Sequence, residues 1–485
     1  ELKIMDVVDI GLTVKKNEDF SEWYQQIVLK SELTDYSEAK GFVVLRPYGF
    51  SIWDQIKQFF DKRIKALGHS DAYFPTLIPE NLLKKEAEHF SGFTPEVFWI
   101  THAGNRKLDE KLAVRPTSET IVYSSYSKWI HSWRDLPLLL NLWNSVLRAE
   151  IKSTKPFIRT SEFLWQEGHT VHETKEEADL EVETIFEIYR VLIEKYLAIP
   201  ALAGKKTEKE KFVGALYTLT LESLMPDGKA LQMGTSHNLG QNFSKSFNIK
   251  FLDKNENEKF AWQTSWGISW RLIGALIMVH GDDKGLILPP KIAPIQVVLI
   301  PIYYNDKDKI NIDKKISEVS NSLSKIQISN YVDNRDDHTP GWKFNHWELK
   351  GIPLRIEIGP KDLSNSELTI VRRDNYEKTR IKEHEYKNIK LILRDIQSNL
   401  YNRARANLKN NITDVTDYKK FVKIIEDKKG FIRTCWCYNE NCEQKIKEET
   451  GSDIRLIPMK KEKIFSDCIY CNKPAKAVVY FSKAY

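Results

Sequence analysis

Residues 146–169 carry two apolar segments separated by a polar loop that contains a proline. Each segment has the composition of a strand, and the loop between them predicts two antiparallel strands. Because side chains alternate across a strand, one face of this pair can present Arg, Glu and aromatic groups together. Arg148 and Arg159 carry planar guanidinium groups suited to phosphate, whereas Phe163 and Trp165 offer flat walls for a ring or a small apolar group. This segment therefore predicts a ligand site on a sheet.

Length and composition describe a large globular chain. Its 485 residues exceed one hydrophobic core, which predicts two or three domains. Hydrophobic content of 41% and charged content of 29% are typical of a soluble protein. The longest apolar runs, such as residues 292–304, are interrupted or too short to span a bilayer, and no secretory signal is recognisable. We therefore expect a cytoplasmic location and no membrane partner, while a net charge of +6 says little about nucleic acid.

Residues 146–169 contain an Arg-x-Glu strand, a loop and a Phe-Leu-Trp-Gln-Glu-Gly-His run. This segment resembles motif 2 of the class II aminoacyl-tRNA synthetases. The Arg-Pro-Thr-Ser-Glu-Thr hexamer at residues 115–120 is similar to the corresponding sequence in the subgroup of these enzymes that handles small or hydroxylated amino acids. Together with the stretches below, the chain resembles the prolyl-tRNA synthetases of the archaeal and eukaryotic cytosolic type, from about residue 11 to 485. This resemblance implies an α+β catalytic domain on an antiparallel sheet, an α/β anticodon-binding domain and a small zinc-binding C-terminal domain.

The expected domains follow changes in the pattern along the chain. Residues 1–293 are predicted to form the catalytic domain, with motif 1 at about 50–80, motif 2 at about 145–170 and motif 3 at about 265–290. Alternating strands and helices predict the α/β domain at 294–394, and the cysteine-bearing domain takes 395–485. Motif 1 is the family's dimer interface, so the resemblance implies a homodimer. From those residues alone, a generic amphipathic helix and edge strand remains the alternative.

The implied reaction has two steps. The carboxylate of L-proline attacks the α-phosphate of ATP, and the prolyl group then passes to the 3′ end of tRNA(Pro). A carboxylate is already ionised at neutral pH, so the first step needs no protein base, only positioning and charge stabilisation. Arg148 and Arg271 are therefore the predicted catalytic residues, with Mg²⁺ accompanying ATP.

Motif 2 and the similar motif 3 at residues 266–274 predict the nucleotide site. The predicted ATP ligands are Arg148, Glu150, Arg159, Thr160, Phe163, Gln232, Thr235, Ser269 and Arg271. Arg271 opens a helix, where amide groups also favour anions. A lone arginine is more commonly a surface ion pair, and here the motif context carries the interpretation. Trp270 departs from the family pattern, which usually has a smaller residue there, and leaves open whether its ring displaces the Arg271 side chain.

Proline selection needs an acceptor for a secondary ammonium and a small apolar pocket. The resemblance implies that the proline-binding residues are Thr117, Glu119, Arg148, Trp165, Glu167, His169, Phe212 and His237. For His169 or Phe212 alone, a packed core residue is the alternative. The stretch between His169 and Gln232 is too short for the hydrolytic domain that bacterial relatives insert there. Since a missing methylene is worth about 1–3 kcal/mol, we expect alanine to be activated without hydrolysis in cis.

Residues 347–362 are similar to the family's anticodon-reading stretch. An acid accepts from a base amine and a cation donates to guanine, which suggests Glu348, Arg355 and Lys361 as readers. A solvated, charged strand edge is the alternative interpretation.

All five cysteines lie between residues 435 and 471, which argues for a local site rather than a disulfide framework. Cys437 and Cys442 are spaced C-x4-C, and Cys468 and Cys471 are spaced C-x2-C, which predicts a structural Zn²⁺. Reduced thiols without metal are the alternative, and Cys435 is a competing ligand.

Two rival functions remain open at this point. The first is a sister class II enzyme, threonyl, glycyl, seryl or histidyl. Threonyl enzymes hold a catalytic zinc with Cys and His, and the absence of cysteine before Cys435 opposes that reading. The second is a catalytically silent tRNA-binding paralogue, which the retained motif arginines oppose and Trp270 leaves open.

Overall fold

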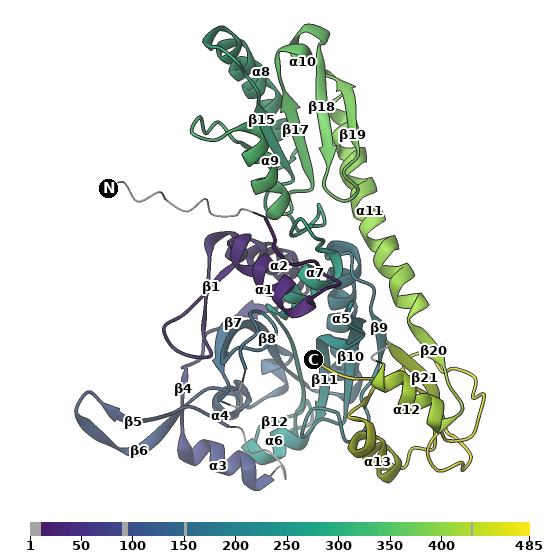
Figure 1. Ribbon diagram of the computed structural model, residues 1–485. Coiled ribbons are helices and arrows are strands. Elements are labelled where there is room, and N and C mark those ends of the chain that lie inside the picture. Colours follow the sequence, from purple (N-terminus) through teal and green to yellow (C-terminus); the bar gives the residue numbers. More distant parts are fainter. Residues whose placement is uncertain (1–10, 90–95, 150–152, 428–429) are drawn as a thin grey trace.

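The computed structural model describes residues 11–89, 96–149, 153–427 and 430–485. It has three parts: a central body, a second α/β body above it, and a smaller body beside the first (Figure 1). A single long helix, α11 (Tyr386–Asn410), runs from the upper body to the smaller one (Figure 1). Among the described residues, no helix is both long enough and apolar enough to cross a membrane.

The central body is built on an 11-stranded sheet. Its strands, in spatial order, are β20 (Ile412–Asp414), β21 (Phe431–Trp436), β23 (Ala477–Ser482), β22 (Asp453–Pro458), β9 (Leu202–Lys205), β10 (Tyr217–Leu224), β11 (Ala230–Gly240), β14 (Trp262–Ser269), β8 (Glu162–His172), β7 (Leu138–Leu147) and β3 (Ser70–Asp71). Neighbours are antiparallel except β20–β21 and β3–β7. The predicted α+β class with an antiparallel sheet is confirmed.

The motif 2 segment forms the predicted pair of antiparallel strands. β7 and β8 pair along their whole length, from Leu138 opposite Val171 to Leu147 opposite Glu162. Gly168 lies opposite Trp266 of the neighbouring strand β14. The Trp266 indole ring occupies the space that a Cβ atom at position 168 would fill. Because any larger residue would collide with that ring, glycine lets β8 and β14 pack flush at this point.

Helices cover the sheet and bury its apolar side chains. The helices that contribute to the largest hydrophobic core are α1 (Phe20–Lys30), α2 (Pro47–Ala66), α5 (Lys175–Val191), the turn η2 (Leu192–Tyr196) and α7 (Arg271–His280). Helix α5 begins with a capping box, in which Thr174 accepts from the Glu177 amide and Glu177 accepts from the Thr174 amide. Helix α7 is apolar on almost every side and is correspondingly buried.

Smaller elements frame the central body. They are β1 (Thr34–Tyr36), β2 (Val43–Leu45), β4 (Leu77–Pro79), α3 (Glu80–His89), β5 (Trp99–Ala103), β6 (Arg106–Val114), α4 (Glu119–Trp129), η1 (Trp133–Asp135), α6 (Asn242–Phe247), β12 (Lys250–Leu252) and β13 (Glu258–Phe260). β4, β5 and β6 form a separate three-stranded sheet.

The upper body is a five-stranded mixed sheet with helices, as predicted for an α/β domain. In spatial order its strands are β16 (Asn330–Val332), β15 (Val297–Pro301), β17 (Leu354–Ile358), β18 (Glu367–Arg372) and β19 (Lys378–Lys382). Its helices are α8 (Asp306–Lys325), α9 (Pro340–Leu349) and α10 (Pro360–Asn365). β15 is parallel to both of its neighbours, and the other pairs are antiparallel.

The smaller body holds α12 (Tyr418–Glu426), α13 (Glu440–Thr450) and the four terminal strands of the large sheet. Its strand β22 pairs with β9 of the central body, through Ile457 opposite Lys205 and Pro458 opposite Gly204. The chain then returns to the central body, where Tyr485 donates its amide to the Ala230 carbonyl at 3.1 Å. The smaller body therefore extends the sheet of the central body.

Candidate functional site

A pocket of about 460 Å³ opens on the central sheet, and a second of about 370 Å³ adjoins it. The predicted ligand residues that line the first are Thr117, Glu119, Arg148, Phe163, Trp165, Glu167, His169, Phe212, Gln232, Thr235, His237, Ser269 and Arg271. The second is lined by Arg148, Arg159, Thr160, Phe163, Ser269 and Arg271. Glu150 lies outside the residues that the structure describes.

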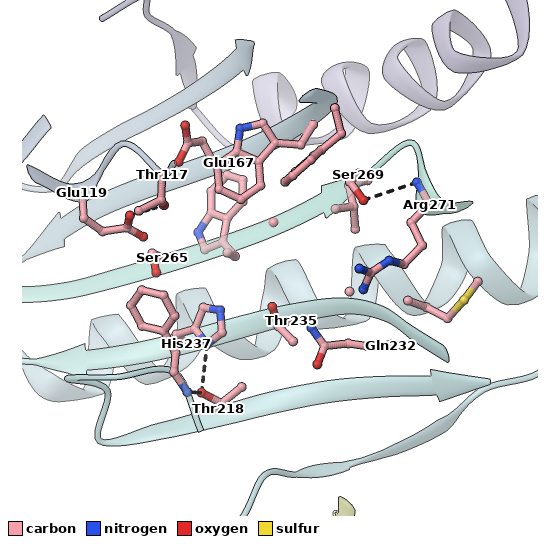
Figure 2. A pocket seen from close by; sticks show the side chains of 18 of the residues that line it. Thr117, Glu119, Glu167, Thr218, Gln232, Thr235, His237, Ser265, Ser269 and Arg271 are labelled. Carbon is pink, nitrogen blue, oxygen red and sulfur yellow. Dashed lines mark hydrogen bonds between the residues drawn. The ribbon is translucent and has the colours of Figure 1, made fainter. Parts of the chain in front are cut away.

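Strand alternation explains why so many predicted residues meet here. Phe163, Trp165, Glu167 and His169 are every second residue of β8, so they share one face of the sheet. On β11 a bulge lies where Gly234 pairs with Leu221 and the next pair is Gln232 with Glu222. The extra residue on β11 changes the direction in which the neighbouring side chains of this strand point. Gln232 and Thr235 consequently both line the pocket although three positions separate them (Figure 2).

The predicted residues separate into two ends of one pocket. Arg271 and Gln232 lie at one end, whereas Thr117, Glu119 and His237 lie at the other (Figure 2). This separation follows the sheet, because Arg271 begins helix α7 directly after β14, and Glu119 begins α4.

Three guanidinium groups converge at the first end. Arg148 follows β7, Arg159 lies in the loop between β7 and β8, and Arg271 opens α7; all three line the smaller pocket. Burial lowers the pKa of Arg271 to about 10, and the positive charge of Arg148 contributes to the same shift. An anion placed among these groups would relieve both their mutual repulsion and their desolvation. This end is therefore suited to a polyphosphate.

Aromatic and hydroxyl groups complete the first end. The Arg148 guanidinium lies 5.2 Å from the ring centroid of Phe163 and 6.0 Å from that of Trp165. The Thr160 hydroxyl is buried without a hydrogen-bond partner among the described residues. A buried polar group without a partner is costly, so a ligand that hydrogen bonds Thr160 would satisfy it.

Trp270 does not displace the Arg271 side chain from the pocket. Its indole ring is 5% exposed and packs edge-to-face on Phe157, with ring centroids 5.6 Å apart. The Arg271 side chain keeps its place in the pocket, and its amide donates to the Ser269 hydroxyl at 3.3 Å. The large ring fits because it belongs to the hydrophobic core beside the motif 2 loop.

A buried carboxylate network forms the second end. Glu167 accepts from the Asn144 amide at 2.9 Å, pairs with His169 Nε2 at 3.0 Å and accepts from the Ser118 hydroxyl. Although burial alone would raise the pKa of Glu167 and lower that of His169, their mutual hydrogen bond and attraction reverse both shifts. His169 and Glu167 are therefore an internally satisfied ion pair that forms a wall.

Glu119 and His237 also line this end of the pocket. Burial raises the pKa of the Glu119 carboxyl, and the charge of Glu167 acts in the same direction. Glu119 accepts from the Thr117 hydroxyl. Burial lowers the pKa of His237 to about 3, so its ring is neutral at pH 7, with Nδ1 at 2.9 Å from the Thr218 hydroxyl. A cationic ligand group would relieve the crowding of carboxylates here.

The structure adds residues that the sequence interpretation missed. Ser265 lines the pocket, and its hydroxyl is buried without a partner in the described part of the chain. Its position four residues before Ser269 on the same strand was the signal, because alternate residues share a face. Thr218 also lines the pocket, directly opposite His237 in the pairing of β10 with β11.

The predicted anticodon readers are not all brought together. Arg355 pairs with Glu348 at 2.9 Å and with Glu357 at 3.0 Å, and its guanidinium lies 4.2 Å from the Phe344 ring centroid. Lys361 is exposed in α10, beyond the opposite end of β17. Glu348 and Arg355 thus form one charged cluster, and Lys361 lies apart from it.

The four predicted zinc ligands do meet. The sulfur atoms of Cys437, Cys442, Cys468 and Cys471 all lie within 4.8 Å of one another. Cys437 Sγ is 3.7 Å from the sulfur atoms of both Cys442 and Cys471. Zinc–sulfur bonds of about 2.3 Å in a tetrahedron separate the sulfurs by about 3.8 Å, so the cluster fits a zinc ion. Cys435 is buried outside this cluster, where its sulfur accepts from the Phe465 amide.

Comparison with known families identifies all three bodies. The family described as tRNA synthetase class II core domain (G, H, P, S and T) matches residues 98–280. An anticodon binding domain matches residues 296–389, and the family described as Prolyl-tRNA synthetase, C-terminal, matches residues 418–485.

Full-length relatives are similar to nearly the whole chain. The proline–tRNA ligase of Cenarchaeum symbiosum is 53% identical over 98% of this chain and 100% of its own length. Proline–tRNA ligase 2 of Clostridioides difficile is 49% identical, with 97% of each chain covered. The proline–tRNA ligase of Alkaliphilus oremlandii is 50% identical, with 96% of each chain covered.

Proposed function

Because this chain belongs to the prolyl-tRNA synthetase family, we propose that it activates L-proline with ATP and transfers the prolyl group to tRNA(Pro). The observation that carries the proposal is the convergence of Arg148, Arg159 and Arg271 on the smaller pocket, which adjoins a larger pocket that holds Glu119 and His237. One end suits phosphates, and the other suits an ammonium group beside a small apolar ring.

Arg148 is the proposed link between the two ligands. It lines both pockets, so its guanidinium can contact the proline carboxylate and the α-phosphate of ATP at once. The carboxylate oxygen attacks phosphorus, the bond to the bridging oxygen breaks, and pyrophosphate leaves with the electron pair. Preformed positive charge at this point favours the transition state, in which negative charge spreads over the phosphoryl oxygens.

We propose the remaining nucleotide contacts from the residues that line the first end. Arg271 and Arg159 hold the far phosphates, Phe163 stacks on adenine, and Thr160, Gln232, Thr235 and Ser269 donate or accept at the ribose and base. Glu150 completes this set on the basis of motif 2 alone. When bound with ATP, Mg²⁺ would supply further charge neutralisation for the phosphates.

Proline recognition is proposed for the second end. Glu119, with Thr117, accepts from the secondary ammonium, and the neutral His237 contacts the carboxylate side. Trp165, Phe212 and the Glu167–His169 pair form the wall of the ring pocket. We add Ser265 as a donor to the carboxylate, because its hydroxyl lines the same cavity and has no hydrogen-bond partner among the described residues.

Transfer of the prolyl group requires the tRNA to reach across the molecule. We propose residues 1–293 as the catalytic domain, 294–394 as the anticodon-binding domain and 395–485 as the C-terminal domain. Glu348, Arg355 and Lys361 remain the proposed anticodon contacts. Between β8 and β11 the chain forms only α5, η2, β9 and β10, which supports the proposed lack of an editing insertion.

Three further properties belong to the proposal. The four-cysteine cluster holds a structural Zn²⁺, supported by the sulfur–sulfur distances. The protein forms a homodimer through the motif 1 region around α2, and it acts in the cytoplasm. These properties rest on the family and on the residue pattern.

The test is ATP–pyrophosphate exchange with each standard amino acid in turn. We expect exchange with proline and weaker exchange with alanine, and exchange with threonine, serine, glycine or histidine instead would favour a sister activity. Arg271→Met should lower the proline-dependent rate about 10²–10³-fold, as for loss of one transition-state donor. Arg134→Met, which changes an exposed arginine on η1, is the matched control and should leave the rate unchanged. A wild-type protein inactive with every amino acid would support the silent paralogue.

A further inference from the structure

Lys155, in the loop between β7 and β8, lies among three aromatic rings that come from distant parts of the chain. Its ammonium nitrogen is 4.8 Å from the ring centroid of Tyr24, 5.2 Å from that of Tyr485 and 5.5 Å from that of Phe20. Phe20 and Tyr24 belong to α1, and Tyr485 follows β23. A cation surrounded by ring faces is held by the electrostatic attraction of each ring.

The backbone connects this cage to Arg159. The Lys155 amide donates to the Arg159 carbonyl at 2.8 Å, and the Arg159 amide donates to the Lys155 carbonyl at 2.8 Å. These two residues therefore form an isolated antiparallel bridge that closes a tight turn. Since the bridge fixes the two backbones opposite each other, a displacement of Lys155 displaces Arg159 as well.

Additional contacts hold the same turn from below. The Tyr24 hydroxyl donates to the Pro156 carbonyl at 2.7 Å. Phe157, with a positive φ of 64°, packs on the Trp270 ring, and Ile158 occupies the space that a side chain at Gly274 would fill. The Tyr485 ring is itself anchored, because its hydroxyl donates to Asp227 at 2.7 Å.

We propose that Lys155 is a positioning residue for the nucleotide: the three-ring cage formed by Phe20, Tyr24 and Tyr485 fixes the turn that presents Arg159 to the ATP phosphates. The inference rests on the proposed function of the site and deepens it. A loop that is ordered before its ligand arrives does not lose conformational freedom on binding, so ATP binds more tightly. The cage acts on ATP and not on proline, because the turn lines only the smaller pocket.

The central test replaces the cation while keeping the length of the side chain. Lys155→Met should raise the ATP KM and the dissociation constant of a non-hydrolysable ATP analogue about 5- to 30-fold, the range expected for loss of a partly desolvated cation–π contact. The proline KM should change by less than about 2-fold, since the turn formed by residues 155–159 does not line the larger pocket that holds the proline end. Lys155→Arg retains a cation and should restore most of the affinity.

Two substitutions at Tyr485 separate the ring from its hydroxyl. Tyr485→Phe keeps the ring and should bind the analogue nearly as the wild type does, whereas Tyr485→Leu should weaken binding. Combining Tyr485→Leu with Lys155→Met should weaken analogue binding no further than Lys155→Met alone, because Lys155→Met already removes the Lys155–Tyr485 contact. The other cation on the Tyr485 ring, Lys229 at 5.0 Å, lies outside the turn that carries Arg159. Lys205→Met, which removes a cation 4.6 Å from the Tyr217 ring away from this loop, is the matched control.

Equal loss of ATP and proline affinity in Lys155→Met, or strictly additive effects of the two substitutions, would overturn the proposal. Unchanged analogue binding in Lys155→Met would overturn it as well. Analogue binding is measured by calorimetry without turnover. This test of Lys155 can therefore be carried out even if the wild-type protein shows no exchange with proline. In that case the proposed function fails, and the positioning role of Lys155 is still decided by the binding data.

Discussion

Arg373 and Asp282 form a two-pronged ion pair, with nitrogen–oxygen distances of 2.7 and 2.8 Å, that ties the anticodon-binding domain to the end of helix α7. Arg373 also donates to the Glu348 carbonyl at 2.9 Å. At its other end, the same helix begins with Arg271 in the phosphate pocket. One short helix thus separates a proposed anticodon contact from a proposed catalytic arginine.

Arg373→Met should lower the free energy of unfolding by about 1.5–3 kcal/mol, the range for hydrogen bonds to charged groups. The Arg373 side chain is 2% exposed, but Asp282 is 31% exposed and regains water, which keeps the loss below that of a fully buried pair. Urea unfolding measures the change. The exposed Arg394 offers the control, and an equal loss in Arg394→Met would remove the special role of the pair.

The contribution of this pair should depend on pH. Burial alone would raise the pKa of Asp282, but the hydrogen bonds and charge of Arg373 more than offset it, so the pKa is lowered. A carboxyl whose pKa is lower in the folded protein stabilises above its unfolded pKa of about 3.9 and loses that effect as pH falls through the folded value. The difference in unfolding free energy between wild type and Arg373→Met should therefore be constant at pH 5–7 and shrink below about pH 4. A constant difference down to about pH 2 would contradict this assignment.

Glu222→Gln should be strongly destabilising. Glu222 is fully buried on β10, where it pairs with Lys206 at 2.7 Å and with Arg455 of β22 at 2.9 Å. Removing its charge leaves two buried cations without a counterion, which costs about 3–5 kcal/mol. Glu258→Gln, which breaks an exposed pair with Lys250, should cost at most about 1 kcal/mol. Similar thermal midpoints for the two variants would contradict the argument.

Zinc should be present in stoichiometric amount and should be needed by the C-terminal domain. Metal analysis of the purified protein tests its presence, and Cys442→Ser tests the site. Loss of zinc from this variant leaves three thiols and a hydroxyl crowded around an empty centre, so the variant should unfold at a lower temperature than the wild type. Cys435→Ser is the control, because Cys435 lies outside the cluster and should leave the metal content unchanged. A zinc-free wild type with an unchanged melting curve after chelation would refute the prediction.

Alanine should support exchange at a kcat/KM about 10- to 200-fold below that of proline. In a pocket that encloses the proline ring, alanine makes fewer contacts than proline, but the pocket cannot exclude the smaller side chain. Alanyl-tRNA formed in this way should persist, because β8 and β11 are joined by α5, η2, β9 and β10 alone. Release of alanine from preformed alanyl-tRNA(Pro) by the purified enzyme would contradict the second part.

Local signals predicted the parts of this protein that depend on neighbours in the chain. The motif 2 strands were predicted because alternation and the intervening loop are local, and β7 and β8 pair as expected. The short spacing of the cysteines likewise placed all four in one cluster. The effect of Trp270 was left open, because the direction of its ring depends on Phe157, which is remote from it in sequence. Ser265 was missed although strand alternation had placed it beside Ser269.

The amino-acid sequence by itself determined the identity of the charged and aromatic groups, the separate strands and helices, and the family to which they point. Only the tertiary structure decided that Lys155 lies between α1 and Tyr485, and that β22 pairs with β9 across about half the length of the chain. Local periodicity specifies which face of a strand is apolar. It does not specify which distant strand completes the hydrogen bonds of a sheet edge, since that choice depends on the packing of the whole chain.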